Sequence, residues 1–173
     1  MNRLTPFLFA GALLFASLPG GAMAAETKPT ATPEPAADTG KPLFDGKTLA
    51  GWKPTGYAGG GEVKVEKGEL LIDQGETLSG VTFTNAVLRM NYEISLEAKR
   101  VSGSDFFCGL TFPVGTNCVT LVVGGWGGAV TGISSIDHQD ASDNETTKYI
   151  KYDTGKWYPI KVRVTPDKIQ VWI

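Results

Sequence analysis

The amino-acid sequence predicts an all-β domain, an antiparallel β-sandwich or barrel, that follows an N-terminal leader. Apolar and polar residues alternate with a period of two in several short segments, as in half-buried strands. Turn-forming residues separate these segments, since the chain contains 22 glycines and 10 prolines. No segment after the leader has the 3.6-residue period of an amphipathic helix. Short strands at even spacing with such turns are typical of antiparallel sandwiches and barrels.

The leader, residues 1–24, has the features of a secretory signal peptide. Arg3 supplies a positive start, residues 4–18 are mostly apolar, and Ala22-Met23-Ala24 is a small-x-small cleavage site. The apolar run is too short for a membrane span and is interrupted by prolines. We therefore expect a periplasmic or secreted protein with no stable membrane insertion once the signal is removed.

The rest of the chain is predicted to be a linker and one domain. Residues 25–41 are rich in Pro, Thr and Ala and lack periodicity, which indicates a disordered spacer. Residues 42–173 have the length of a single domain with its own core. The formal net charge is −2, and Lys and Arg are scattered, so no nucleic acid partner is expected.

The domain opens with the sequence LFDGKTLAGW, residues 43–52. Asp45-Gly46 is a turn signal. A hairpin is predicted next, because residues 62–66 and 69–73 alternate around Lys67-Gly68. The apolar residues of the opening sequence are expected to anchor it in the core: Leu43, Phe44, Leu49 and Trp52.

The clearest strand signal covers residues 87–99. Here every second residue is apolar and the residues between them are polar, so one face is predicted to be buried. The predicted inward residues are Leu88, Met90, Tyr92, Ile94, Leu96 and Ala98.

Two further strand pairs are predicted downstream. Residues 105–112 and 118–123 alternate around a turn at 113–117, and residues 158–164 and 169–173 form the last pair. The sequence stops inside this last pattern, which would leave a strand edge unpaired. We therefore expect a sandwich that is incomplete at its C-terminus.

Cys108 and Cys118 are the only two cysteines of the chain. Because an exported protein meets an oxidising compartment, a disulfide between them is predicted. A five-residue loop at 111–115 would place them opposite each other in a hairpin. A four-residue loop would place them on opposite faces and forbid the bond. The alternative to the disulfide is two separate buried thiols. Either role is structural, since no histidine lies nearby in the sequence to activate a thiol.

Several of these segments together resemble a known family. LFDGKTLAGW, a long alternating strand, and then GKWYPIKVRV and DKIQVWI are similar to the exported 3-keto-disaccharide hydrolase domains. Those domains are concanavalin A-like jelly-roll sandwiches and commonly begin with a sequence motif of the type L-F-x-G-x-x-L-x-G-W. The resemblance covers most of residues 42–173 and implies this jelly-roll fold.

The resemblance also implies carbohydrate chemistry outside the cytoplasm. A 3-keto group acidifies the C2 proton of a glycoside, so that a base can remove it, the glycosidic oxygen can leave and water can add. This requires a base poised near neutral pH and a positive group near the enolate oxygen. Family members often carry an acid and a glutamine on the strand after the hairpin, in a motif like E-V-Q-I-x-D. The comparable strand here, residues 119–123, has no ionisable group. The resemblance then implies either a divergent site in the following loop or sugar binding without cleavage.

That following loop, residues 124–147, holds the candidate site residues. Trp126 lies between four glycines, where its ring is either a stacking surface for a sugar or a plug at a bulge of the sheet. His138, the single histidine, is a candidate base with Asp137 and Glu145 as catalytic neighbours, or else a solvated surface residue. Asp140 and Asn144 are candidate ligands for sugar hydroxyls.

The acids of this loop are also candidate ligands of Ca²⁺ or another divalent metal. Asp137, Asp143 and Glu145 offer the oxygen atoms that calcium prefers, although their spacing is not that of an EF-hand. The alternative is a solvated acidic loop. The function hypotheses are therefore an extracytoplasmic 3-keto-glycoside-cleaving enzyme, a non-catalytic sugar-binding sandwich with a carbohydrate ligand, or an interaction domain without a sugar site.

Overall fold

The computed structural model describes residues 40–173, which contain eleven β-strands and no helix. Residues Pro42–Ile173 form one structural unit. The predicted signal peptide (1–24) lies outside the described residues, as does nearly all of the predicted linker (25–41). Within residues 40–173 there is no helix that could cross a bilayer. The strands are β1 (Trp52–Pro54), β2 (Val63–Glu66), β3 (Glu69–Ile72), β4 (Val81–Phe83), β5 (Tyr92–Ala98), β6 (Cys108–Val114), β7 (Asn117–Gly125), β8 (Val130–Ser134), β9 (Lys148–Tyr149), β10 (Tyr158–Val164) and β11 (Ile169–Trp172).

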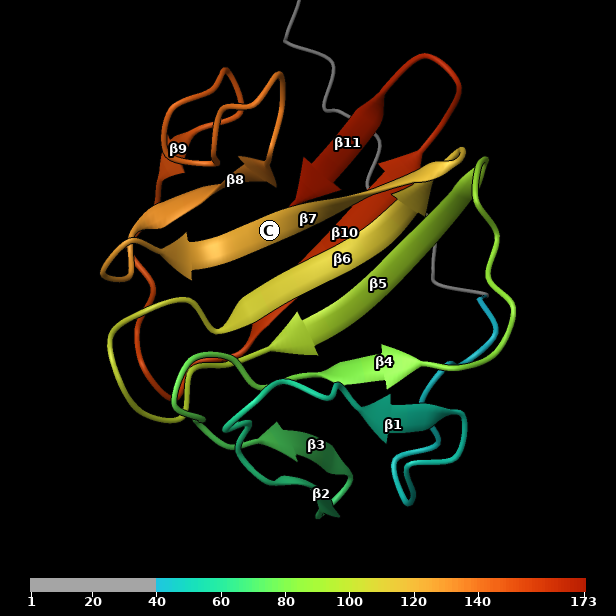
Figure 1. The fold of residues 1–173 in the computed structure, drawn as a ribbon, viewed down its shortest axis with the longest axis vertical. Coiled ribbons are helices and arrows are strands. Elements are labelled where there is room, and N and C mark those ends of the chain that lie inside the picture. The colour runs from blue at the N-terminus through green and yellow to red at the C-terminus, as the bar shows by residue number, and fades with distance from the viewer. Residues whose placement is uncertain (1–39) are drawn as a thin grey trace, which may run out of the picture. The chain divides into compact units, whose positions relative to one another are not determined.

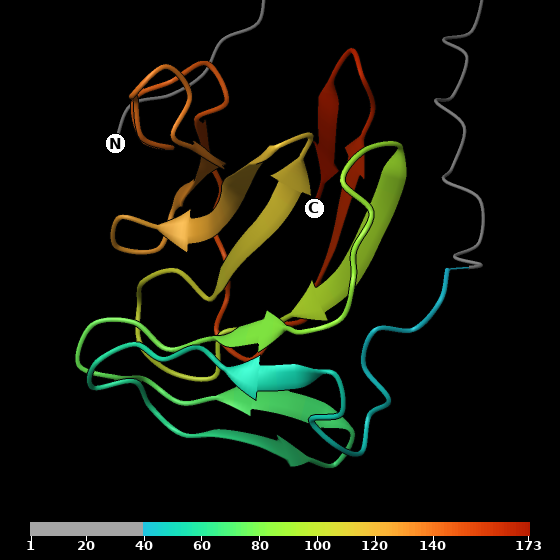
Figure 2. The same ribbon diagram turned by 45° about the vertical axis from the view of Figure 1, so that its right-hand side comes forward.

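Two antiparallel sheets face each other across the core. One has the strand order β6-β7-β8-β9 and the other the order β11-β10-β5. In Figure 1, β6 and β7 pass in front of β10 and β11, and Figure 2 shows the two layers side on. The short ribbons β1-β4 and β2-β3 lie near the C-terminal end of β5 in both views. The predicted jelly-roll β-sandwich is thus confirmed.

The core is built mainly by alternation, as in β5 and β10, whereas β8 is buried on both faces. In β10, the even-numbered residues Ile160, Val162 and Val164 are buried. They pack against Phe112 of β6 and Leu121 of β7 in one apolar cluster. This cluster is where most of the apolar burial, and so most of the stabilisation, is concentrated.

The predicted strand at 87–99 is shorter than expected. β5 begins at Tyr92, because Asn91 has a left-handed backbone (φ 57°) that interrupts the strand. Alternation holds from Tyr92 to Ala98, and Met90 still packs against the core. The inward prediction for Leu88 is wrong, since its side chain is 68% exposed.

The opening sequence forms a self-bonded loop rather than a set of core anchors. None of its four apolar residues belongs to the main apolar cluster of the described residues. Instead, Trp52 Nε1 donates to the Leu43 carbonyl (2.8 Å), and the Trp52 ring packs on Phe83 with centroids 4.9 Å apart. The Asp45 carboxylate accepts from the main-chain N–H groups of Lys47 and Thr48, both at 2.8 Å, and from the Thr48 hydroxyl.

A two-residue turn, Gly115-Thr116, connects β6 to β7. The predicted turn at 113–117 is therefore too long, and the strands continue to Val114 and from Asn117. The register pairs Cys108 with Val123, and Pro113 with Cys118. The predicted hairpin around Lys67-Gly68 is confirmed as β2-β3, with both turn residues at positive φ.

The disulfide predicted between Cys108 and Cys118 is absent, because both cysteines are free. Their positions in the hairpin differ by five residue pairs, about 17 Å along the strands, whereas a disulfide needs Cα atoms within about 7 Å. Cys108 is buried in the core and Cys118 is exposed. Burial raises the pKa of the Cys108 thiol to about 12.

This arrangement predicts one reactive thiol in the folded protein. Iodoacetamide should label Cys118 alone under native, non-reducing conditions, and both cysteines after unfolding, as counted by mass spectrometry. The C118S variant should take up no label until it unfolds. If the unfolded, non-reduced chain took up no label, the two cysteines would not be free and the arrangement would be wrong.

The opening loop predicts a pH effect. The Thr48 hydroxyl, together with the N–H groups of Thr48 and Lys47, lowers the pKa of Asp45 from 3.8 to about 2. The stabilisation from this group is fully present above pH 3.8 and is lost as the pH falls through 2. Urea unfolding should show D45A to be less stable at pH 6, and the difference should shrink towards pH 2. D167A, which removes an exposed aspartate from another turn, is the control; an Asp45 titration near 3.8 by NMR would refute the effect.

Candidate functional site

The outer face of β6, β7 and β8 presents a row of hydroxyl groups. Because Phe112 and Leu121 point into the core, their neighbours Thr111 and Thr120 point away from it. The register aligns Thr111 with Thr120, and Thr120 with Ser134. The Oγ1 atoms of the two threonines are 2.8 Å apart and share a hydrogen bond. Three neighbouring strands therefore contribute one hydroxyl each to a line across the sheet.

A carboxylate continues this line beyond β8. Asp140 Oδ1 accepts hydrogen bonds from Ser134 Oγ (3.3 Å) and Ser135 Oγ (3.4 Å). The Asp140 residue is exposed, and none of the described residues donates a hydrogen bond to its second oxygen. The row thus consists of three hydroxyl groups and ends in a charged acceptor.

An aromatic ring lies over the neighbouring row of the same face. This row pairs Gly109 with Val122, and Val122 with Gly132. A Cβ atom at Gly109 would lie 3.7 Å from the Phe106 ring, so the ring covers this glycine. Phe106 remains 45% exposed. Neighbouring rows on one face are about 7 Å apart, so that one sugar ring could contact both the aromatic ring and the hydroxyls.

Trp126 lies in the turn between β7 and β8 and is 51% exposed. Gly128 N donates to Gly125 O (3.1 Å), and the central residues Trp126 and Gly127 both have positive φ (50° and 81°). The register of β7 and β8 shifts just before this turn, as in a β-bulge. The bulge interpretation is therefore right, but the tryptophan does not plug the core and its ring is available for contact.

His138 and Asp137 lie beyond the opposite end of β8. They are the central residues of a tight turn closed by hydrogen bonds between Ile136 and Gln139, and both have positive φ (67° and 50°). Both side chains are exposed. Within the described part of the chain, no hydrogen bond or ion pair orients the His138 ring.

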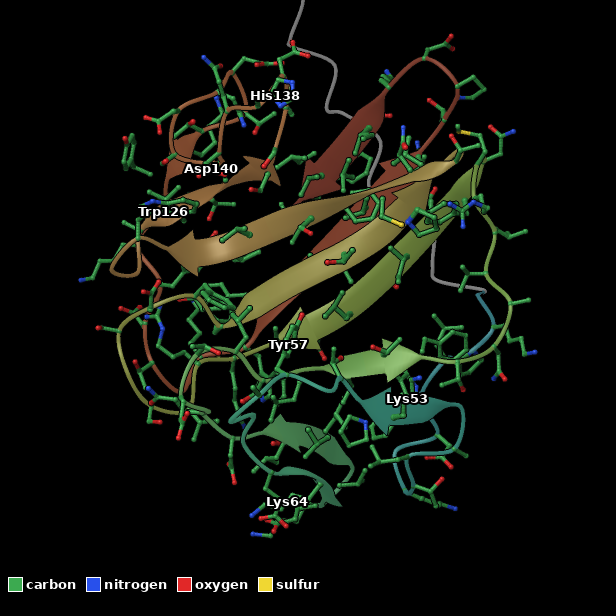
Figure 3. All side chains as sticks on the ribbon, viewed as in Figure 1. Lys53, Tyr57, Lys64, Trp126, His138 and Asp140 are labelled. Carbon is green, nitrogen blue, oxygen red and sulfur yellow. The ribbon has the colours of Figure 1, made fainter. Side chains whose placement is uncertain are left out.

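The structure therefore separates the predicted site residues into two groups. β8 extends about 13 Å between the Trp126 turn and the loop that carries His138, Asp140 and Asn144. Figure 3 shows Trp126 near the start of β8, with His138 and Asp140 in the loop that follows the strand. Of the predicted residues, Asp140 adjoins the hydroxyl row.

Asn144 is buried, and its amide holds this loop together. Nδ2 donates to the carbonyls of Ile133 (2.8 Å), Gln139 (3.1 Å) and Asp140 (2.8 Å). Oδ1 accepts from both the N–H and the hydroxyl of Thr146. Such a fully occupied amide fixes the position of Asp140 rather than offering hydrogen bonds to a ligand.

The loop that contains Asn144 packs on the outer face of β8 at Gly132. A Cβ atom at Gly132 would lie 2.9 Å from the Ala141 carbonyl oxygen, so only glycine permits this approach. Ala141 is fully buried there, and Thr146 Oγ1 accepts from Ile133 N (2.9 Å).

The acidic residues of the loop do not converge. Asp143 accepts from the Ser142 hydroxyl (2.9 Å), and both Asp143 and Glu145 are exposed. Within residues 40–173, no three His, Cys, Asp or Glu side chains lie close enough to hold a metal ion together. Calcium binding through Asp137, Asp143 and Glu145 remains a prediction, as do the catalytic roles of His138, Asp137 and Glu145.

Sequence reasoning missed Phe106, Thr111, Thr120 and Ser134. The alternation of β6 and β7 contains the signal, because Thr111 and Thr120 fall at outward positions once the hairpin register is known. Phe106 has no such signal, since it lies in a loop and reaches the sheet only by tertiary packing.

Comparison with known families supports the resemblance of the opening sequence. The model described as a 3-keto-alpha-glucoside-1,2-lyase-like domain matches residues 39–173. This match includes every strand and the whole outer face, and it confirms the predicted family. No curated protein and no solved structure matches the chain.

The buried amide predicts a large effect of substitution in the loop. N144A removes five hydrogen bonds and leaves one buried and two part-buried carbonyls without this partner, so it should lower the free energy of unfolding by about 2–4 kcal/mol in urea titrations. Q139A keeps both main-chain bonds of the same loop and should change the stability by less than about 0.5 kcal/mol. Equal effects of the two substitutions would rule out the structural role of Asn144.

Proposed function

The chain belongs to the 3-keto-alpha-glucoside-1,2-lyase-like domain family, and we propose that it is an extracytoplasmic domain that binds a glycoside on the outer face of β6, β7 and β8. The signal-peptide features of residues 1–24 support the extracytoplasmic part of this proposal.

One observation carries the proposal: the line of hydroxyls from Thr111 through Thr120 to Ser134, which ends at the Asp140 carboxylate. Sugar hydroxyls both donate and accept hydrogen bonds, and so do these serine and threonine groups. Because the row lies on rigid strands, its spacing is preorganised, which lowers the entropic cost of binding.

Phe106 supplies the apolar half of the site. Its ring covers Gly109, one row away from Thr111, and leaves 45% of its surface exposed. A pyranose ring has an apolar face of CH groups and a polar rim. Stacking of that face on Phe106 would direct the rim towards the threonines about 7 Å away.

A second candidate function is cleavage of a 3-keto-glycoside, and the position of Asp140 favours it. Its carboxylate adjoins the proposed sugar face and could remove the acidified C2 proton. The Thr111 and Thr120 hydroxyls share one hydrogen bond, so the hydroxyl that accepts in this pair keeps its own O–H free and would then stabilise the enolate oxygen as a donor. His138 is less suited to this role, because no described group orients its ring.

The binding proposal is tested by calorimetry of the full chain with trehalose and 3-keto-trehalose. T120V keeps the shape of the side chain and removes one hydroxyl, so it should weaken binding about fivefold, which corresponds to about 1 kcal/mol. F106A should weaken it about tenfold through loss of stacking.

The chain offers a matched control for the threonine substitution. Thr55, which follows β1, and Thr82 of β4 form the same kind of hydroxyl pair, 2.8 Å apart. T82V should leave the affinity unchanged. Equal losses in T82V and T120V, or no measurable binding of either sugar, would refute the outer face as the site. Binding should persist in EDTA, since this proposal needs no calcium.

Turnover of 3-keto-trehalose separates the two candidate functions. If the domain cleaves this sugar, D140N should abolish product formation while H138A retains it. Loss of turnover in H138A with D140N unaffected would instead assign the base to His138. If the wild-type protein binds the sugar but forms no product, binding is its function and cleavage is excluded.

A further inference from the structure

A pocket of about 480 Å³ lies at the end of the sandwich near the turn between β7 and β8. Three loops that are distant in the sequence form its walls: residues 100–104, 127–129 and 149–154. The pocket does not include the hydroxyl row or Phe106. It is thus a separate site, and an inference from it does not rest on the proposed function.

Arg100 lines this pocket and is buried, with only 6% of its surface exposed. Its Nε donates to the Asp105 carbonyl (2.9 Å), Nη1 to the Tyr152 carbonyl (3.3 Å) and Nη2 to the Gly128 carbonyl (3.4 Å). The guanidinium group thereby contacts all three loops. A guanidinium has five N–H donors, so two remain after these three bonds.

Within the part of the chain that the structure describes, no carboxylate pairs with this buried charge. None of the residues in 40–173 forms an ion pair with Arg100. The Asp105 side chain is engaged elsewhere, where its carboxylate accepts from Phe106 N (2.8 Å). Three carbonyl groups and the Phe107 ring, whose centroid is 5.3 Å from Arg100 Cζ, solvate the guanidinium only in part, and a buried charge without a counter-ion is costly.

The pocket lining adds positive charge and no negative charge. It contains two cationic side chains, Arg100 and Lys151, and no Asp or Glu. Its other hydroxyls belong to Ser104, Tyr149 and Thr154, whereas the hydroxyl of Tyr152, which also lines the pocket, is hydrogen-bonded to Thr131 in the core (2.9 Å). Tyr149 is 77% exposed at this position and offers a flat apolar surface. Positive charge, hydroxyls and an exposed ring together favour a small anion that carries an organic body.

We propose that this pocket binds the carboxylate group of a small organic acid, with hexuronates as the sugar-like members of that class. A planar carboxylate matches the remaining N–H groups of a guanidinium and provides the missing counter-ion. Lys151 adds attraction at the pocket wall, and Tyr149 packs against the body of the ligand. Gly128 permits the site, because a Cβ atom there would lie 2.4 Å from the Ser104 carbonyl oxygen and 3.4 Å from Arg100 Nη2.

The proposal is tested by calorimetric titration of the full chain with sodium glucuronate and with glucose at constant ionic strength. Glucuronate should bind at least tenfold more tightly than glucose, because the two sugars differ in the carboxylate. Sodium acetate should compete with glucuronate, whereas sodium sulfate at the same ionic strength should compete at least tenfold less well. Equal binding of the two sugars, or equal competition by sulfate, would overturn the carboxylate assignment.

A pair of substitutions at Ala129 locates the binding. Ala129 is exposed and lines the pocket, so a longer side chain there should not disturb the core. A129E tethers a carboxylate beside Arg100 and should reduce the glucuronate affinity at least tenfold. A129Q has nearly the same size without the charge and should stay within threefold of the wild type. Equal affinities of the two variants would place glucuronate elsewhere and refute the pocket.

These experiments can refute the outer-face site and the pocket site independently of each other. The outer face is tested with neutral sugars and Thr120 or Phe106 variants, and the pocket with carboxylates and Ala129 variants. Arg100 itself is a less useful target, since R100K would also remove hydrogen bonds that connect three loops.

Discussion

The register of the β6-β7 hairpin is the constraint on which the rest of the domain depends. The two-residue turn Gly115-Thr116 pairs Thr111 with Thr120 and Phe112 with Val119. A shift of one residue would place Phe112 opposite Thr120 and Thr111 opposite Leu121, so that one of the two strands would turn its apolar residues out of the core and its threonine inward. The same register separates Cys108 from Cys118 and leaves the first thiol in the core. Core packing, the hydroxyl row and the free cysteines are thus three consequences of one turn.

The loop after β8 extends this constraint to the end of the hydroxyl row. β8 pairs with β9 only at Val130 and Thr131, so its later residues have free main-chain groups on that edge. Asn144 and Thr146 satisfy the groups of Ile133, as a further strand would do. This bonding also brings Asp140 next to Ser134. Asp140, the side chain at the end of the row, is thus positioned by Asn144, which is buried and cannot itself contact a ligand.

Sequence patterns predict the strands of this domain better than they predict its site. Period-two alternation identifies β5, β10 and β11 because it is a direct record of one buried face. It cannot specify a loop such as that of Asn144, whose partners are three main-chain carbonyls that meet only after the loop folds over Gly132. A main-chain carbonyl has the same chemistry at every residue, so nothing in the sequence marks these three. For the same reason an asparagine among acids suggested a ligand group, whereas the structure gives it an internal role.

Arg100 is different, because alternation does record its position. It has the same parity as Tyr92, Ile94, Leu96 and Ala98, two residues beyond the last inward residue of β5. A charged residue at an inward position is a departure from the pattern that needs a physical reason, since burial of its charge is unfavourable unless the group is paired. Its carbonyl partners explain how three loops are held in place, but carbonyl dipoles bind a cation without neutralising it. The remaining charge faces a pocket without acids, and this makes the guanidinium both a structural link and a receptor for an anionic group.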